Sequence, residues 1–197
     1  MAGTGIKLTG AWSKWLASLD PAKFKQRLEV NVRKATLLNA LLVKREIRKR
    51  IKGNEFAPNS PLTLAIKAPG TKPLVHESDL FQSITHELLD SFNAYVGVNR
   101  KAKGKDGADL VNIGIVLHEG ATLVVTPAMR AAVFAKARRN AKGAKYLDEI
   151  SQSGQPAAQV WRIPPRPFIR VVMEDEALVR KIVANWDKAV EDALFSK

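Results

Sequence analysis

Three prolines within four residues constrain this chain more than any other feature of its sequence. Pro164, Pro165 and Pro167 fix the backbone φ angle and remove amide protons that a strand or helix would use. The residues that precede them are also biased toward extended geometry. The apolar, strand-like segment 160–163 must therefore end here, and the chain must run extended to Phe168. We expect a rigid corner that ends a strand and sets the angle of the last helix.

Two side chains are expected to hold this proline-rich corner in place. Arg166 is predicted to hydrogen-bond to carbonyl groups of a turn, and Phe168 is predicted to anchor the corner in the core.

Composition limits the class of protein. The chain has 197 residues, 46% of them hydrophobic, which is enough for one domain with a core. There is no cysteine, so disulfides and thiolate metal sites are excluded. We find neither a signal-peptide pattern nor an apolar run of about 18 residues, and expect no membrane contact. The net charge of +13 favours polyanionic partners, either nucleic acid or acidic protein surfaces.

A long helix is predicted over residues 21–52. Asp20 and Pro21 form a helix-start signal, and Gly53 follows the last periodic residue. The middle of this helix is apolar over a wide arc, which predicts burial on several sides, in a monomer core or in a subunit interface. Leu37 and Leu41 are our candidate interface residues there.

The end of this helix is strongly basic. Its basic residues are Lys44, Arg45, Arg48, Lys49, Arg50 and Lys52. They are either a solvated face or a contact for an acidic or phosphate-bearing partner. Trp12 and Trp15, ahead of the helix, predict docking against this domain or against a partner chain.

The rest of the chain predicts an α+β fold. The expected elements are an antiparallel hairpin over 83–88 and 92–98, a helix over 110–119, a strand over 121–125, a helix over 127–140 that Gly143 closes, a polar connection over 144–157, and a last helix over 173–195. The last helix is expected to bury one face, made of Val179, Ile182, Val183, Trp186, Val190 and Leu194. Together these give a small antiparallel sheet packed with a long N-terminal helix, a middle helix and a C-terminal helix. We expect one domain over 1–197, with an N-terminal arm and basic helix in 1–54 and a sheet-containing core in 55–197.

No reaction centre is apparent in the sequence. The histidines His76, His86 and His118 have no metal-ligand spacing, and no phosphate-binding loop or nucleophile elbow occurs. The pair His118 and Glu119 comes nearest to a site, and we predict a capping or interface role for the histidine. We therefore expect no catalysis, cofactor or metal. The other candidate partner or DNA contacts are the basic pairs Arg100 and Lys101, and Arg138 and Arg139.

Several fragments, in order along the chain, resemble one family. They are residues 59–63 (NSPLT), 73–84 (PLVHESDLFQSI), 96–98 (VGV), 118–121 (HEGA), 125–130 (VTPAMR) and 163–169 (IPPRPFI). In this order the chain resembles the tailed-phage virion-morphogenesis proteins, the Mu- and P2-type tail-completion family. The most specific fragment is the Pro-Arg-Pro-Phe motif, which places Arg166 and Phe168 in the family pattern. The likeness spans roughly residues 55–195.

The resemblance implies a structural role without catalysis. It implies a homo-oligomeric, hexameric ring that completes the head-proximal end of the tail or joins tail to head. The implied partners are copies of the chain itself and other neck and tail proteins, such as connector, adaptor, terminator or tube subunits. The implied location is the virion, after assembly in the host cytoplasm, with non-specific contact to DNA in the lumen. The alternatives are a tail terminator, a connector or stopper subunit of the neck, and a basic nucleic-acid-binding protein.

Overall fold

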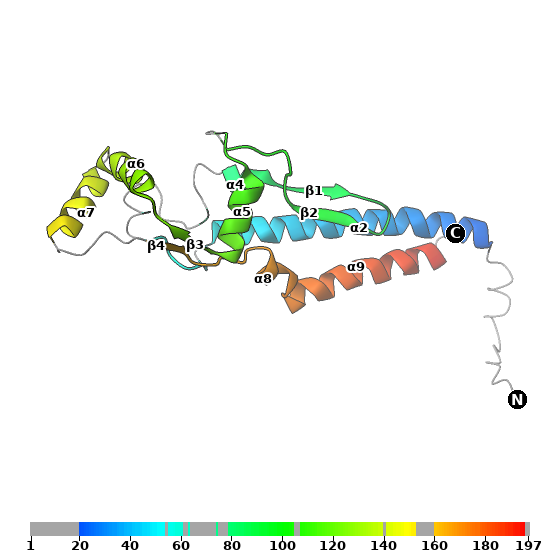
Figure 1. Cartoon of the computed structure of the whole chain (residues 1–197). Helices are drawn as coiled ribbons and strands as arrows, with labels where there is room; N and C mark the ends of the chain where they lie inside the picture. The colour runs from blue at the N-terminus through cyan, green and yellow to red at the C-terminus, as the bar shows by residue number, and fades with distance from the viewer. Residues whose placement is uncertain are drawn as a thin grey trace, which may run out of the picture.

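The computed structural model describes residues 20–53, 55–60, 63, 74, 79–104, 107–139, 141–152 and 160–195. Within these residues the molecule is elongated around one helix, α2 (Pro21–Lys52) (Figure 1). Helix α9 (Glu176–Phe195) lies along one side of α2, and a β-hairpin lies along another side. Trp12 and Trp15 lie outside the described residues.

Helix α2 begins and ends at the predicted residues. The Asp20 carboxylate accepts hydrogen bonds from the backbone N–H groups of Ala22 at 3.0 Å and Lys23 at 3.3 Å. At the other end, the Gly53 N–H donates to the carbonyls of Lys49 and Arg50. Both ends of the helix therefore have partners for backbone groups that would otherwise lack one.

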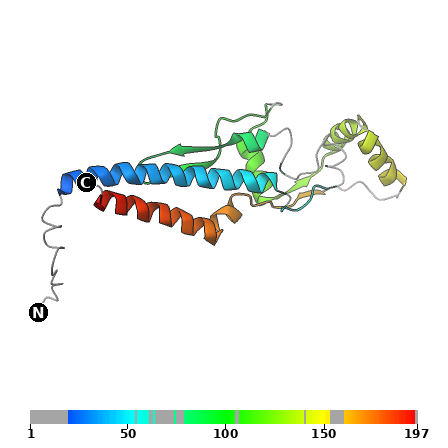
Figure 2. The same cartoon turned by 180° about the vertical axis from the view of Figure 1, so that it is seen from behind.

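The last helical region is interrupted, whereas we predicted one continuous helix from residue 173. A short helix, α8 (Arg170–Met173), is followed by α9, and Asp175 lies between them. The Asp175 carboxylate accepts from the N–H groups of Ala177 and Leu178, so it caps a new helix. Helix α9 then returns antiparallel to α2, which brings its end beside the start of α2 (Figures 1 and 2).

The predicted buried face of α9 is largely wrong. Val179, Val183, Trp186 and Val190 are exposed, and the buried residues are Leu178, Ala189 and Ala193. Small side chains allow α9 to approach α2 closely, where Val32 and Ala35 pack against Ala189. The helix is thus rotated so that Val179, Val183 and Val190 lie beside the contact with α2, while Trp186 at its edge still bonds Thr36.

The predicted hairpin is present. Strands β1 (Ile84–Leu88) and β2 (Ala94–Val98) pair antiparallel, with Ile84 opposite Val98 and Leu88 opposite Ala94. A short helix, α4 (Asp79–Ser83), precedes β1. Strand β2 begins later than predicted because Phe92 belongs to the turn, where the Asp90 carboxylate accepts its N–H at 2.7 Å.

A second two-stranded sheet lies beyond the end of α2. Helix α5 (Leu110–Glu119) ends at Gly120, whose φ of 78° and closeness to the Ile163 carbonyl leave no room for a side chain. Strand β3 (Ala121–Val124) follows and pairs antiparallel with β4 (Val160–Ile163). The antiparallel pairing that we predicted is thus split between two small sheets.

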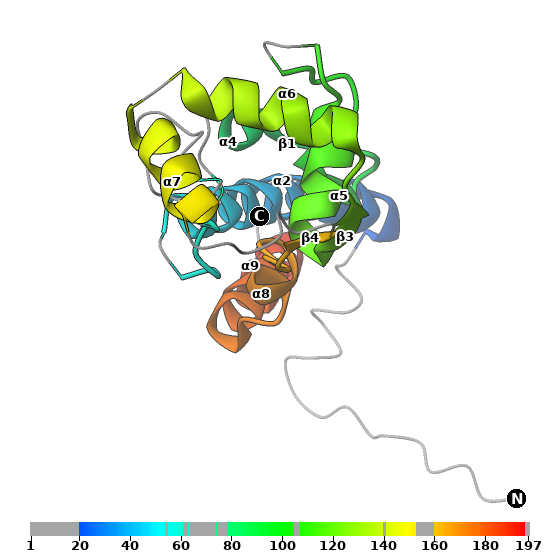
Figure 3. The same cartoon turned by 60° about the vertical axis from the view of Figure 1, so that its left-hand side comes forward.

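Helices α6 (Pro127–Arg138) and α7 (Ala141–Gln152) form a helical pair at the far end of the molecule (Figure 3). Our prediction that Gly143 ends α6 and that a polar connection follows is wrong. Gly143 lies inside α7, and a Cβ there would come within 2.1 Å of the Ala137 carbonyl oxygen. The glycine therefore permits close packing of the two helices.

The main core gathers where α2 meets the hairpin, α5 and the α8 region. We call this cluster the junction core. Its buried members are Val43, Ile47, Ile51, Leu74, Leu80, Ile84, Val98, Leu110, Phe168, Val172 and Leu178. The α+β fold class and the long N-terminal helix are as predicted.

Candidate interaction surface

Arg166 is buried in the junction, with only 3% of its surface exposed. Its Nε donates to the Ala57 carbonyl at 3.0 Å, and its Nη2 donates to the Pro58 carbonyl at 3.2 Å and to Asn59 Oδ1 at 3.3 Å. Its own N–H donates to the Leu117 carbonyl at 2.9 Å. Burial lowers the pKa of Arg166, but a guanidinium keeps its charge in proteins. The side chain therefore joins the segment at 57–59 to the proline-rich corner, as the sequence predicted.

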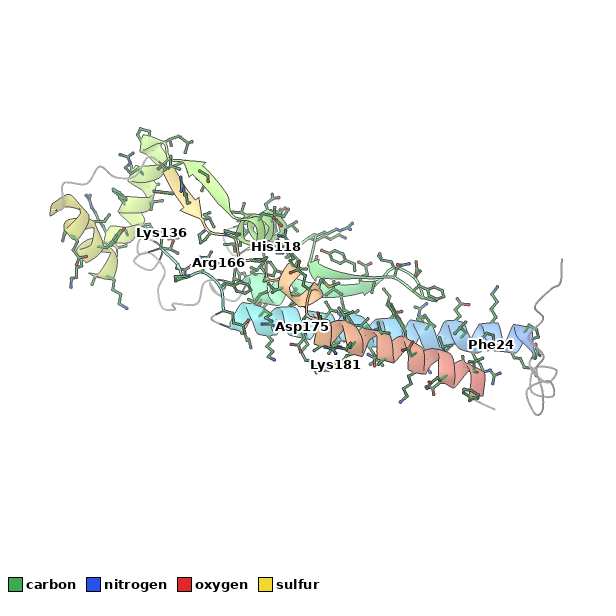
Figure 4. All side chains as sticks on the ribbon, turned by 90° about the horizontal axis from the view of Figure 1, so that it is seen from below. Phe24, His118, Lys136, Arg166, Asp175 and Lys181 are labelled. Carbon is green, nitrogen blue, oxygen red and sulfur yellow. The ribbon has the colours of Figure 1, made fainter. Side chains whose placement is uncertain are left out.

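Phe168 is the largest fully buried side chain of the junction core, with 1% exposure. Its ring meets the edge of the His118 ring, with 5.4 Å between centroids. His118 lies near the middle of the elongated molecule, close to Arg166 (Figure 4). The predicted anchoring role of Phe168 agrees with this burial.

His118 has a structural role in this arrangement. Its Nε2 accepts the Arg170 backbone N–H at 3.3 Å at the start of α8, and its Nδ1 lies 2.6 Å from Glu119 Oε1. With Nε2 as acceptor, the proton belongs on Nδ1, which can donate to Glu119. The bond from His118 and the positive charge of Arg170 lower the pKa of the Glu119 carboxyl. The imidazole thus caps a helix, as we predicted, and both of its nitrogens are engaged.

Two of the basic residues near the end of α2 bind the hairpin. Arg48 Nη2 donates to the carbonyls of Gln82 at 3.3 Å and Ile84 at 3.1 Å, and its guanidinium lies over the Phe81 ring. Lys44 Nζ lies 3.4 Å from His86 Nδ1. Burial, together with the charges of Lys44 and Arg48, lowers the pKa of His86. These contacts hold α2 to the hairpin, so Lys44 and Arg48 do not form a free partner-binding patch.

The remaining basic residues of α2 differ in exposure. Arg50 forms ion pairs with Glu55 and Asp175, which connects α2 to the start of α9. Arg45 and Lys49 both lie close to Glu46 and keep more than two thirds of their side chains exposed. Of the predicted basic contacts on α2, only Arg45 and Lys49 are well placed to meet another molecule.

The other predicted basic contacts lie away from α2. Arg100 stacks over the Tyr95 ring at 5.3 Å, and Lys101 is exposed beside it. Arg138 and Arg139 are exposed at the end of α6, in the helical pair at the far end (Figures 3 and 4). The structure therefore spreads the predicted basic residues over separate surfaces and does not bring them into one site.

A hollow of about 330 Å³ lies between α2, α4 and the loop after β2. Its charged lining residues are the basic Lys44, Arg48 and Lys103 and the acidic Asp79. Lys103 is paired with Asp109 at 3.2 Å, and Arg48 already bonds the hairpin. The hollow is thus an open surface with more basic than acidic side chains, two of which already have partners, and it does not resemble a ligand pocket.

The most unusual surface of the molecule is the outward face of α2. Asn39 is buried against α9, where its Nδ2 donates to the Ile182 carbonyl at 3.1 Å. Leu37 and Leu41 lie two residues before and after it, and two residues correspond to about 200° of helix rotation. Both leucines therefore point away from α9, and 37% and 43% of their surfaces are exposed.

Helix α9 has a comparable face. Asn185 donates to Asn39 Oδ1 at 2.6 Å, so the positions two residues away, Val183 and Asp187, point away from α2. Val183 is 47% exposed, and Val179 and Val190 extend the same stripe. Contiguous exposed apolar residues of this kind mark interaction surfaces, whereas scattered single ones do not.

These two faces were only half predicted from the sequence. Leu37 and Leu41 were named as interface candidates, and the structure leaves both exposed. The α9 stripe was assigned to the core, and its role as surface was missed. Asn39 and Asn185 carried the missing signal, because paired amides mark where the two helices meet.

Within the described residues there is no cluster of histidine and acidic groups that could hold a metal ion. Nor does any helix among them have the length and hydrophobicity needed to cross a membrane. Comparison of the chain with protein-family models, curated proteins and solved structures finds no match.

Proposed function

We propose that this chain is a structural subunit that assembles with copies of itself into a ring in the neck of a tailed-phage virion. It completes the head-proximal end of the tail or joins the tail to the head. Two supports come from the sequence: the ordered fragments that resemble the tail-completion family, and the proline-rich corner with Arg166 and Phe168. The structure is compatible with this role because both residues of that motif are engaged in the junction.

The observation that carries the proposal is the pair of exposed apolar faces on α2 and α9. The side chains of the junction core are buried by contacts within the chain. Leu37, Leu41 and Val183, in contrast, are exposed along the elongated pair of helices. Obligate subunit contacts are large and more apolar than ordinary surfaces. A protein that works by assembly needs such faces.

The self-assembly is tested by the mass of the purified protein in solution at low and high salt. We expect a closed oligomer whose mass changes little with salt, because apolar contacts are not screened. In the virus, removal of the gene should leave unjoined heads and tails and no infectious particles. A protein that stays monomeric at all concentrations, and whose loss leaves particles infectious, would contradict the proposal.

A second candidate, nucleic-acid binding, is favoured by one feature. The helical pair at the far end presents exposed basic residues, namely Lys136, Arg138, Arg139, Lys142 and Lys145. If they bind DNA, the logarithm of the binding constant should fall with the logarithm of salt concentration, with a slope of about −0.9 per phosphate neutralised. Binding without that slope, or no binding at low salt, would exclude this function.

A further inference from the structure

The outward faces of α2 and α9 carry opposite charges. On α2 the outer face consists of Val30, Lys34, Leu37, Leu41 and Arg45, which share one side of the helix. On α9 the outer face consists of Glu176, Val179, Val183, Asp187, Val190 and Glu191. The charged members of the α2 outer face are basic, and those of the α9 outer face are acidic. Arg180 lies beside the α9 face and is paired with Glu176 at 3.5 Å, which leaves Asp187 and Glu191 as a net negative surface.

The two outer faces are different surfaces of the same pair of helices, and the valines of the α9 face lie beside Trp186, whose Nε1 donates to Thr36 of α2. Each is defined by residues that point away from the Asn39–Asn185 contact between the helices. A surface that must meet its own copy in a symmetric dimer is self-complementary, whereas ring-forming contacts join two different surfaces. A basic apolar face and an acidic apolar face on the same chain fit the second case.

The faces also lie at the same level along the molecule. The helices run antiparallel, and Trp186 Nε1 donates to Thr36 Oγ1 at 3.3 Å while Asn185 bonds Asn39. Because the helices are antiparallel, a step toward the end of α2 corresponds to a step toward the start of α9. Leu41 therefore lies at the same height along the helix axes as Val179 and Val183. By the same reasoning, Lys34 lies level with Asp187 and Glu191, and Arg45 lies level with Glu176.

We propose that the α2 outer face of one copy packs against the α9 outer face of the next copy, side by side, in a head-to-tail contact. Leucines of α2 then meet valines of α9, and Lys34 meets the carboxylates of Asp187 and Glu191. Since self-assembly is itself proposed above, this pairing rests on that function. The pairing adds to that function a statement of which two surfaces meet, and it requires that these two surfaces differ from each other.

Two single substitutions test the two faces one at a time. Leu41→Glu places a carboxylate on the basic face, opposite the acidic face of the neighbour, and Val183→Lys places an ammonium on the acidic face. Both positions are exposed, so the fold should be kept. Val124→Lys, on exposed β3 far from these faces, is the matched control (Figure 1). The mass of each variant is measured by sedimentation, with thermal unfolding alongside.

We expect Leu41→Glu and Val183→Lys each to be monomeric and Val124→Lys to keep the mass of the unsubstituted protein. When the two monomeric variants are mixed, one intact α2 face and one intact α9 face remain. The mixture should associate one-to-one through these intact faces although neither variant associates alone, which no contact between like faces can produce.

Other results would overturn the pairing. One is an oligomer that survives both substitutions, in which case self-assembly stands but uses other surfaces. Others are a variant that still dimerises with itself, a mixture that stays monomeric, or a control that dissociates as readily. A lowered unfolding midpoint for Val183→Lys with an unchanged oligomer mass would mean that the chain itself covers the α9 face. If the unsubstituted protein is monomeric, the proposed function fails as well.

Discussion

The two ends of helix α2 are stabilised in different ways. Near its end, one face of the helix is buried in the junction core, where Ile47 and Ile51 are fully buried. Near Val32 and Ala35 it has only a small apolar contact with Ala189, and polar bonds complete the packing. We call this outer part of α2 and α9 the arm.

The difference shows which part of the molecule can fold by itself and which part is open to a partner. The junction core removes large side chains from water, and burial of each contributes about 1.5–3 kcal/mol. The arm buries alanines and joins its helices through Asn39 and Asn185, while Leu37 and Val183 stay outside. We infer that the junction provides stability within the chain and that the arm provides surface for assembly.

The largest expected effect is in the junction core. Phe168→Ala should lower the free energy of unfolding by about 3–5 kcal/mol, because it leaves a cavity among buried side chains. Chemical denaturation of the variant measures this. Phe195→Ala, at an exposed phenylalanine at the end of α9, is the control and should change stability little. Equal losses from both variants would mean that the junction is not the stabilising centre.

A smaller loss is expected at the polar part of the same junction. Arg166→Lys keeps the charge but loses the planar guanidinium that bonds the segment at 57–59. Buried carbonyls left without a donor should cost about 1–3 kcal/mol in unfolding free energy. Arg180→Lys, at an exposed arginine on α9, is the matched control. An unchanged midpoint for Arg166→Lys would show that the corner does not depend on these bonds.

Much of the junction could be predicted from sequence because local rules govern it. The prolines around Arg166 fix the corner whatever surrounds them, and at the other end of α2 Asp20 and Pro21 fix the start of the helix in the same local way. Helix α7 was missed because Gly143 is a helix-ending residue in most settings. Here it is required inside the helix by contact with Ala137.

The arm could not be predicted in the same way. The period of α9 shows an apolar stripe but not which molecule covers it. Leu178, Ala189 and Ala193 take the contact with the rest of the chain, which rotates the stripe outward. The choice depends on the shape and polar groups of α2, which are distant in sequence. The same rotation exposes the α9 outer face.

A further prediction concerns the contact between the two helices of the arm. Asn185→Ala removes the donor to Asn39 Oδ1, while Asn39 keeps its bond to the Ile182 carbonyl. The free energy of unfolding should fall by about 1–3 kcal/mol, less than for Phe168→Ala, because the oxygen of the buried Asn39 loses this donor. Asn112→Ala, on the exposed side of α5, is the control. A loss as large as that of Phe168→Ala would contradict the difference between arm and junction.

The smallest expected effect is a pH dependence where the arm meets the junction. The N–H groups of Leu178 and Ala177 and the charge of Arg50 lower the pKa of the Asp175 carboxyl below its ordinary 3.8. A carboxyl whose pKa is lower in the folded state stabilises that state above the unfolded-state pKa, and the gain is lost as pH falls through the folded-state pKa. The stability difference between the native protein and Asp175→Asn should therefore be largest near neutral pH and shrink in acid. Denaturation of both proteins across this pH range measures the difference. A difference that stays constant in acid would mean that the Asp175 charge does not stabilise the start of α9.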